Sequence, residues 1–396
     1  MIAGGFGPFS GAELTGVLHE ATATTNRRLT GATLHDVQFR GGHYYAIAEV
    51  TAHHHGGVGH FYYGLTTAPV PIEAPGRAIS YGGHSMFVWE HPQDPLLPGL
   101  KLAATPSTVR RNFTGNRQLT GLHTVIYRPM NRAVFKAYLA PLFPGAVGDT
   151  IYLKVLRPDM AAGLYDTHLT LGQAGVPVAT PVRPPIKDVL ALAGGHGMPL
   201  GELIRSEGAH NPFDPRELIE ILDRFPPEVM DYPYRRSWAE RHQEFVAVAR
   251  QAMPAYDARL AHLGNRLEQA HQGLDLGPLV PTHADLYEAH ILVDPSTGRI
   301  QHILDIDGAG PGYRVDDYAC LIGHLAVLGQ PGHHQWGWQT AQRFFQQLAP
   351  YTNPVALAVR SAAVVLSLIP AYQPDDVTRA TGAAYLSVAE QLLGPH

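Results

Sequence analysis

Cysteine is nearly absent from this chain of 396 residues, in which Cys320 is the only one. A single thiol cannot close an intramolecular disulfide, which excludes a disulfide-stapled secreted fold and indicates a reducing compartment. Long apolar runs are also missing, so no segment is predicted to cross a bilayer. Residues 1–5 carry neither a basic flank nor a sustained apolar stretch, and so give no sign of a signal peptide. We therefore expect a cytoplasmic protein that does not use a membrane.

Positive charge is scarce as well, because the chain has a formal net charge of −5 at pH 7. This balance lacks the basic footprint of a nucleic-acid-binding protein. Lysine is rare, and arginine supplies most of the 29 positive side chains, a skew typical of a GC-rich bacterial source. The hydrophobic content of 45% is sufficient for two or three subdomains with their own cores. The lysines are Lys101, Lys136, Lys154 and Lys187.

One stretch near residue 285 has the character of a site. Asp285 follows His283 at a spacing of two, and the β-prone runs 291–293 and 300–304 come directly afterwards. The segment 294–299 between these runs contains proline, serine and glycine, which predicts a turn and hence a β-hairpin.

The hairpin would bring its two ends together. His290 precedes the first strand and Asp305 follows the second, so we expect the two side chains to lie close to each other and beside Asp285. A carboxylate that accepts the proton of a hydroxyl group, next to ligands for a metal that holds nucleotide phosphates, is the equipment of phosphoryl transfer.

These segments resemble the aminoglycoside phosphotransferase family, which has the protein-kinase-like fold, and within it the maltokinase and glucosamine kinase branch. The family's catalytic loop begins His-Gly-Asp and ends in Asn or Gln; here residues 283–286 read His-Ala-Asp-Leu, with His290 in the last place. The family's metal segment corresponds to residues 304–312, with Asp317 before the apolar stretch 319–322. Two segments in the expected order are a more specific signal than either alone.

The resemblance implies an α+β, two-lobed protein-kinase-like fold with a β-rich N-lobe, a helical C-lobe and an N-terminal α/β cap subdomain. We assign the cap to residues 1–100, the nucleotide-binding N-lobe and hinge to 101–199, and the C-lobe to 200–396. Periodicity and turn signals predict helices at residues 11–23, 158–172, 215–225, 237–253, 256–270, 355–369 and 378–393. They predict strands at residues 33–39, 44–51, 60–66, 122–127, 133–139, 150–156, 175–180 and 188–193.

The nucleotide contacts are expected in the N-lobe. Lys154 lies within an apolar strand, where its charge needs a partner, and nucleotide phosphates would serve. Lys136 is the second candidate, and an edge-strand lysine that faces solvent is the structural alternative. The resemblance places adenine against the backbone of Ala191, Leu192 and Ala193; a plain strand end followed by a glycine turn is the alternative.

The resemblance also assigns the roles in the C-lobe. Asp285 would act on the acceptor hydroxyl, His283 would organise the loop, and Asp317 would anchor it through backbone hydrogen bonds. Asp305 would bind the metal, Mg²⁺ with Mn²⁺ as the alternative ion. Since Mg²⁺ prefers oxygen ligands, His290 either binds the metal, leaves that duty to Asp305 and Asp307, or marks a lost activity. We predict the second outcome, with Mg²⁺ retained.

The function expected from these residues is ATP-dependent transfer of the γ-phosphate to a hydroxyl of a small sugar, aminosugar or aminoglycoside-like acceptor. Two alternatives stay open: a pseudokinase or nucleotide-binding scaffold without transfer, and a kinase that acts on a peptide. The pseudokinase is favoured by His290, by the lack of glycine in the turn at residues 128–132, and by the lack of glutamate in the helix after Lys154.

Overall fold

The computed structural model describes residues 10–54, 56–81, 83–143, 148–329, 336–369 and 376–394. The chain divides into two compact units. The N-terminal unit takes the chain up to Asp166 and then Pro181–Gly194, whereas the C-terminal unit takes Thr167–Thr180 and the chain from Gly195 onwards. Within the described ranges, no helix has both the length and the apolar character needed to span a membrane.

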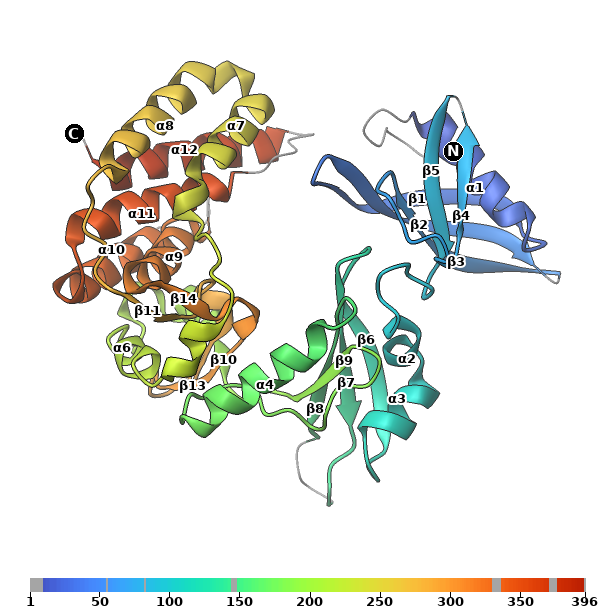
Figure 1. The fold of residues 1–396 in the computed structure, drawn as a ribbon, viewed down its shortest axis with the longest axis horizontal. Helices are drawn as coiled ribbons and strands as arrows, with labels where there is room; N and C mark the ends of the chain where they lie inside the picture. Colours follow the sequence, from blue (N-terminus) through green and yellow to red (C-terminus); the bar gives the residue numbers. More distant parts are fainter. Residues whose placement is uncertain are drawn as a thin grey trace. The chain divides into compact units, whose positions relative to one another are not determined.

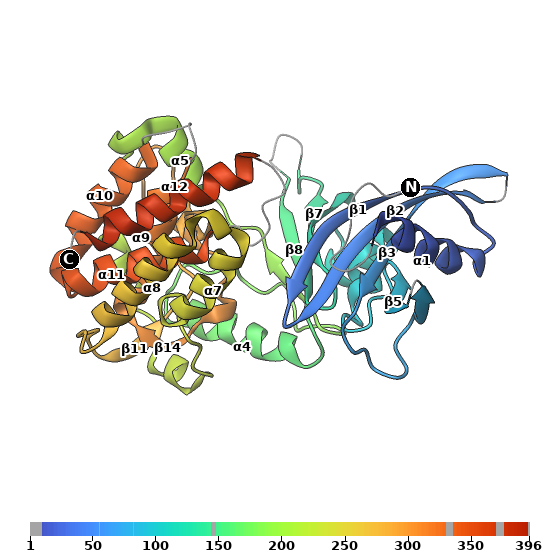
Figure 2. The same ribbon diagram turned by 90° about the horizontal axis from the view of Figure 1, so that it is seen from above.

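The N-terminal unit begins with helix α1 (Gly11–Ala23), which packs on a five-stranded antiparallel sheet (Figure 2). Ser10 and Glu13 close a capping box that starts the helix. The strand order is β1-β2-β3-β5-β4, and alternate residues of β2 are buried against α1. The strands are β1 (Arg28–Arg40), β2 (His43–His54), β3 (Gly57–Thr66), β4 (Arg77–Tyr81) and β5 (His84–Glu90).

A second antiparallel sheet, in the order β6-β7-β8-β9, follows in the same unit. Two short helices, α2 (Leu100–Ala104) and α3 (Pro106–Phe113), share its core. Sequence patterns did not predict them, although Pro106 occupies the first turn of α3, where its missing N–H has no cost. Helix α4 (Met160–Gln173) comes after β8. The strands are β6 (Leu119–Arg128), β7 (Arg132–Leu139), β8 (Thr150–Val155) and β9 (Val189–Ala193).

The C-terminal unit is mainly helical. Helix α11 (Pro354–Ser367) lies between α9 and α12 and is buried along most of its length (Figure 1). Asn353 starts it by accepting the N–H groups of the first turn. The other helices are α5 (Leu200–Glu207), α6 (Glu217–Leu222), α7 (His242–Ala252), α8 (Asp257–His271), α9 (Arg314–Val327), α10 (Trp336–Leu348) and α12 (Asp376–Leu393). The strands are short: β10 (Met198–Pro199), β11 (Leu279–Thr282), β12 (Ile291–Val293), β13 (Ile300–Ile303) and β14 (Gly310–Tyr313).

The predicted fold class is confirmed: an α/β cap, a β-rich part and a helical part follow one another along the chain. The division at residues 100 and 199 stays a prediction. The strand predicted at residues 175–180 is wrong, because only Val178 forms a β-bridge, with Ile303. Pro177 accepts the N–H of Ile303 but has no N–H of its own, so a ladder cannot extend there. The helix predicted at residues 237–253 begins only at His242, after a short 3-10 turn.

Candidate active site

Two short antiparallel ladders carry the candidate site, which lies within the C-terminal unit. Strand β11 pairs with β14, and β12 pairs with β13. The catalytic loop (residues 283–290) runs from β11 to β12, and the metal loop (residues 304–309) runs from β13 to β14. Because both loops join the same two ladders, they lie side by side. A Cβ atom at Gly308 would lie only 3.1 Å from the carbonyl oxygen of His283.

The predicted hairpin between the two loops is confirmed. Asp294 caps its turn by accepting the backbone N–H groups of Ser296 and Thr297, at 2.8 and 3.0 Å. Gly298 has φ of +72°, a conformation that a residue with a side chain adopts only under strain. The two strands therefore return His290 and Asp305 to the same edge.

A buried carboxylate anchors the start of the catalytic loop. Asp317, in α9, is fully buried and accepts the N–H of His283 at 3.1 Å and that of Ala284 at 2.8 Å. Ala284 has φ of +67°, so these bonds hold a strained backbone in place. Burial raises the pKa of Asp317 to about 6, against the opposing effects of Arg314 and the two N–H groups. The contacts agree with the anchoring role expected for Asp317.

His283 joins the two loops through Nε2 and supports its own loop through Nδ1. Its Nε2 is 2.8 Å from the carbonyl oxygen of Leu304, which can only accept, so Nε2 carries the proton. Its Nδ1 then accepts the N–H of Asp285 at 3.2 Å. Burial is the main cause that lowers the pKa of His283 to about 4, which keeps the ring neutral near pH 7. A neutral ring with fixed hydrogen bonds supports the organising role rather than proton transfer.

Three ligand atoms from the two loops converge. Asp285, His290 and Asp305 each place one such atom within 4.8 Å of the others. The Nδ1–H group of His290 donates to the carbonyl oxygen of Asp285 at 2.8 Å, so in the neutral ring the lone pair is on Nε2. That Nε2 lies 3.6 Å from Oδ2 of Asp305. Asp305 has a left-handed backbone, with φ of +55°, as strained residues at functional sites often do.

The donor set fits a divalent cation. The Nε2 atom of His290 and Oδ2 of Asp305 are 3.6 Å apart, close enough to bind one cation together. A metal-binding histidine usually donates its other N–H to a carbonyl or carboxylate, as His290 does to Asp285. The structure thus brings His290 into the group that sequence reasoning had left to Asp305 and Asp307. Within the described residues, Asp307 is not one of the three that converge.

The residues predicted to contact the nucleotide lie in the N-terminal unit. Strand β8 is flanked by β7 and β9, so Lys154 is not on an edge strand and that alternative is excluded. Ala191, Leu192 and Ala193 lie on β9, opposite β8. The carbonyl oxygen of Ala191 already accepts the N–H of Val182 at 2.8 Å. Their contacts with a nucleotide stay predictions.

Several neighbours of the site were not found from the sequence. The ring of Tyr287 stacks on His324 of α9 at 4.2 Å and lies 4.0 Å from the ring of His290. Trp238, from the segment before α7, donates its indole N–H to Oδ1 of Asp285 at 3.2 Å. The sequence gives no signal for the contacts of Tyr287 with His324 and of Trp238 with Asp285, because each joins segments that are distant along the chain.

Comparison with protein families agrees with this reading of the loops. A sequence model of the "Phosphotransferase enzyme family" matches residues 188–350, which include Asp285, His290 and Asp305. This family match confirms the prediction of an ATP-dependent phosphotransferase that acts on hydroxyl groups. No curated protein matches the chain. The narrower prediction of a maltokinase-like branch stays a prediction.

Solved structures resemble the chain at low identity. A choline kinase from Cryptosporidium parvum has 11% identity and a TM-score of 0.48, over 73% of this chain and 95% of that one. A macrolide 2'-phosphotransferase from Brachybacterium faecium has 20% identity and a TM-score of 0.41, over 74% and 98%. An aminoglycoside phosphotransferase from Streptomyces rimosus, in complex with ADP and streptomycin, has 17% identity and a TM-score of 0.38, over 75% and 99%.

Proposed function

We propose that the protein transfers the γ-phosphate of ATP to a hydroxyl group of a small sugar-like molecule. The observation that carries the proposal is the convergence of Asp285, His290 and Asp305 from two adjacent loops. Phosphoryl transfer depends mainly on positioning and on stabilising charge, and this site has a fixed carboxylate beside a cation-binding group.

Each residue has a task in this proposal. Asp285 orients the acceptor hydroxyl and takes up its proton, since its carboxylate lies next to the cation-binding group and is held by Trp238. His283 and Asp317 hold the backbone on which Asp285 lies. Lys154 balances the charge of the α- and β-phosphates, and the backbone at Ala193 receives adenine.

Asp305 and His290 would hold the divalent cation, beside the carboxylate of Asp285. A bound cation would neutralise charge on the nucleotide phosphates. Mg²⁺ remains the ion we propose, with Mn²⁺ as the alternative, because a nitrogen ligand suits Mn²⁺ at least as well. A sugar or aminosugar acceptor rests on the family resemblance of the motifs and not on a contact in the site.

The test is release of ADP from ATP in the presence of sugars, aminosugars and aminoglycosides, with the phosphorylated product identified by mass spectrometry. We expect one acceptor class to stimulate ADP release, and Asp285→Asn to abolish the stimulation while nucleotide still binds. Nucleotide binding without transfer to any acceptor would instead favour the pseudokinase. Transfer to a peptide hydroxyl alone would refute the small-molecule acceptor.

A further inference from the structure

The carboxylate of Asp285 has a partner outside the two site loops. The indole Nε1–H of Trp238 donates to its Oδ1 at 3.2 Å. Rotation of an aspartate carboxylate about its last side-chain bond is soft, so the side chain alone does not fix its oxygens. A donor from a separate segment restricts this rotation, because one of the two carboxylate oxygens is then held by a hydrogen bond.

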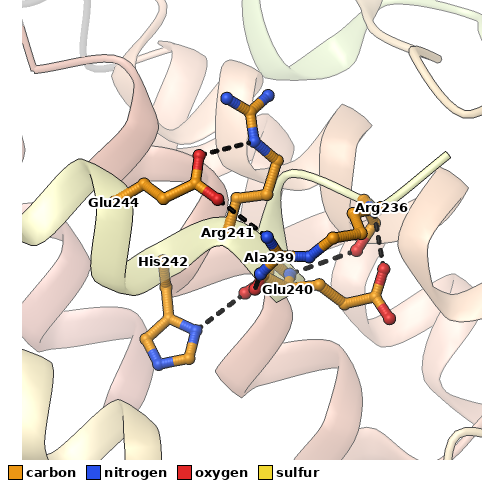
Figure 3. A network of polar contacts seen from close by, with 7 residues as sticks. Arg236, Ala239, Glu240, Arg241, His242 and Glu244 are labelled. Atoms are coloured by element: carbon orange, nitrogen blue, oxygen red, sulfur yellow. Dashed lines mark hydrogen bonds and ion pairs between the residues drawn. The ribbon is translucent and has the colours of Figure 1, made fainter.

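The segment that carries Trp238 is itself held firmly. Ser237 and Glu240 exchange backbone and side-chain hydrogen bonds, at 2.7 and 3.2 Å, in the pattern of a capping box. The carboxylate of Glu244 accepts from Arg236 at 2.8 Å and from Arg241 at 3.0 Å, and Figure 3 draws both contacts. The residues on both sides of Trp238 are therefore held in place by contacts that do not involve Asp285.

A buried arginine ties this segment to α9 and α11. Arg360 is 3% exposed and donates to Ser237 Oγ at 3.0 Å and to Oδ1 of Asp316 at 2.8 Å. Asp316 is the neighbour of Asp317, which anchors the catalytic loop. Asp316 thus supports the Trp238 segment through Arg360, and Asp317 supports the loop of Asp285 through its backbone. The two aspartates are adjacent in α9.

We propose that Trp238 is a positioning residue, whose indole N–H sets the orientation of the Asp285 carboxylate toward the acceptor hydroxyl. This inference rests on the proposed function of Asp285. Trp238 is half-buried, and its ring also packs on Phe245, with ring centroids 5.8 Å apart. The hydrogen bond and the ring packing are therefore separable by substitution.

Trp238→Phe removes the N–H group and keeps an aromatic ring. We expect kcat to fall about 10- to 100-fold, the cost typical of a misplaced catalytic group, while KM for ATP changes less than about twofold. Phe245→Leu, which alters the packing of the indole and keeps its N–H, should have a smaller effect on kcat. Trp336→Phe, the same change at an exposed tryptophan of α10, should leave kcat unchanged.

A second measurement does not depend on turnover. The chain has 4 tryptophans, so a spectrum of ¹⁵N-labelled indoles should show that number of resonances, and Trp238→Phe assigns one of them by its loss. Asp285→Ala should shift the Trp238 resonance, because its acceptor is gone. Asp307→Ala should leave it in place.

The two measurements separate this inference from the proposed function. A Trp238 resonance that ignores Asp285→Ala would overturn the hydrogen bond, and a wild-type kcat in Trp238→Phe would overturn its role. A drop in thermal stability that accounts for the loss of activity would also count against positioning. Absence of any transfer by the wild type, with a responsive resonance, would refute the proposed function and leave the contact established.

Discussion

The two units hold their candidate residues by different means. In the C-terminal unit, three groups of the catalytic loop are held by residues outside it: His283 by Leu304, Asp285 by Trp238, and the loop backbone by Asp317. In the N-terminal unit, Lys154 lies on β8, whose backbone is paired with β7 on one side and β9 on the other.

The difference separates two ways to build a site. A loop that carries strained backbone, such as Ala284 and Asp305 at positive φ, needs buried partners to stay in place. A sheet fixes its backbone through the ladders on both sides, and sites built on strands are held more precisely than sites on loops. Substitution in the loops should therefore disturb geometry and chemistry together, whereas substitution on the sheet should leave the backbone of the site in place.

Asp305→Ala should have the largest effect. It removes the carboxylate that faces Nε2 of His290 at 3.6 Å, and we expect kcat to fall at least about 10³-fold because the cation-binding group is broken. Steady-state turnover at saturating ATP and metal gives the measurement. Asp307→Ala is the matched control and should lose much less activity. Metal-dependent turnover that survives Asp305→Ala would remove the basis of the site.

Lys154→Ala should have the next largest effect and should act mainly through the nucleotide. We expect kcat/KM for ATP to fall roughly 10- to 100-fold, since one charge contact with phosphate is lost, with little change in thermal stability. Lys136→Ala is the control on the neighbouring strand. The ammonium of Lys136 lies over the rings of Tyr138 and Tyr152, at 5.2 and 5.5 Å, so it already has partners within the sheet. A larger loss of kcat/KM for ATP in Lys136→Ala than in Lys154→Ala would make Lys136 the phosphate-binding lysine.

Much of the site was predictable because its signals are local. The spacing of His283 and Asp285, and the turn chemistry between residues 293 and 300, predicted the hairpin that brings His290 to Asp305. The role of His290 was not settled by sequence, since it depends on which ring nitrogen meets the carbonyl oxygen of Asp285. Only the folded loop fixes that choice.

The remaining parts depend on contacts between distant segments. Trp238 lies 47 positions from Asp285, and Arg360 lies 44 positions from Asp316, so periodicity does not report either pair. Propensity also misled at residues 175–180, where β-prone side chains surround Pro177, which cannot donate to a ladder.

His290→Asn should change metal preference more than maximal rate. It replaces a nitrogen ligand by an amide oxygen, which suits Mg²⁺ better than Mn²⁺. We expect the ratio of Mn²⁺- to Mg²⁺-supported turnover to fall roughly three- to tenfold, measured from activity against free metal concentration. An unchanged ratio would show that His290 does not bind the metal and would return that duty to Asp305 and Asp307.

His324→Gln should change turnover at pH 7 least and should act on stability at low pH. Burial lowers the pKa of His324 to about 4, from 6.5 in the unfolded chain. Between pH 4 and pH 6.5 only the unfolded chain binds the proton. The contribution of the neutral ring to the free energy of unfolding is therefore complete above pH 6.5 and is lost as the pH falls through 4. At pH 5 this proton binding lowers the free energy of unfolding by about 2 kcal/mol relative to pH 7. Urea unfolding at pH 7 and pH 5 should therefore show a smaller acid-induced loss of stability in His324→Gln than in the wild type.

The same substitution at exposed His262 of α8 is the matched control for loss of an imidazole. Equal losses in His324→Gln and the wild type would show that the ring behind Tyr287 is open to water, and that this side of the site is less tightly closed than its stacked rings indicate.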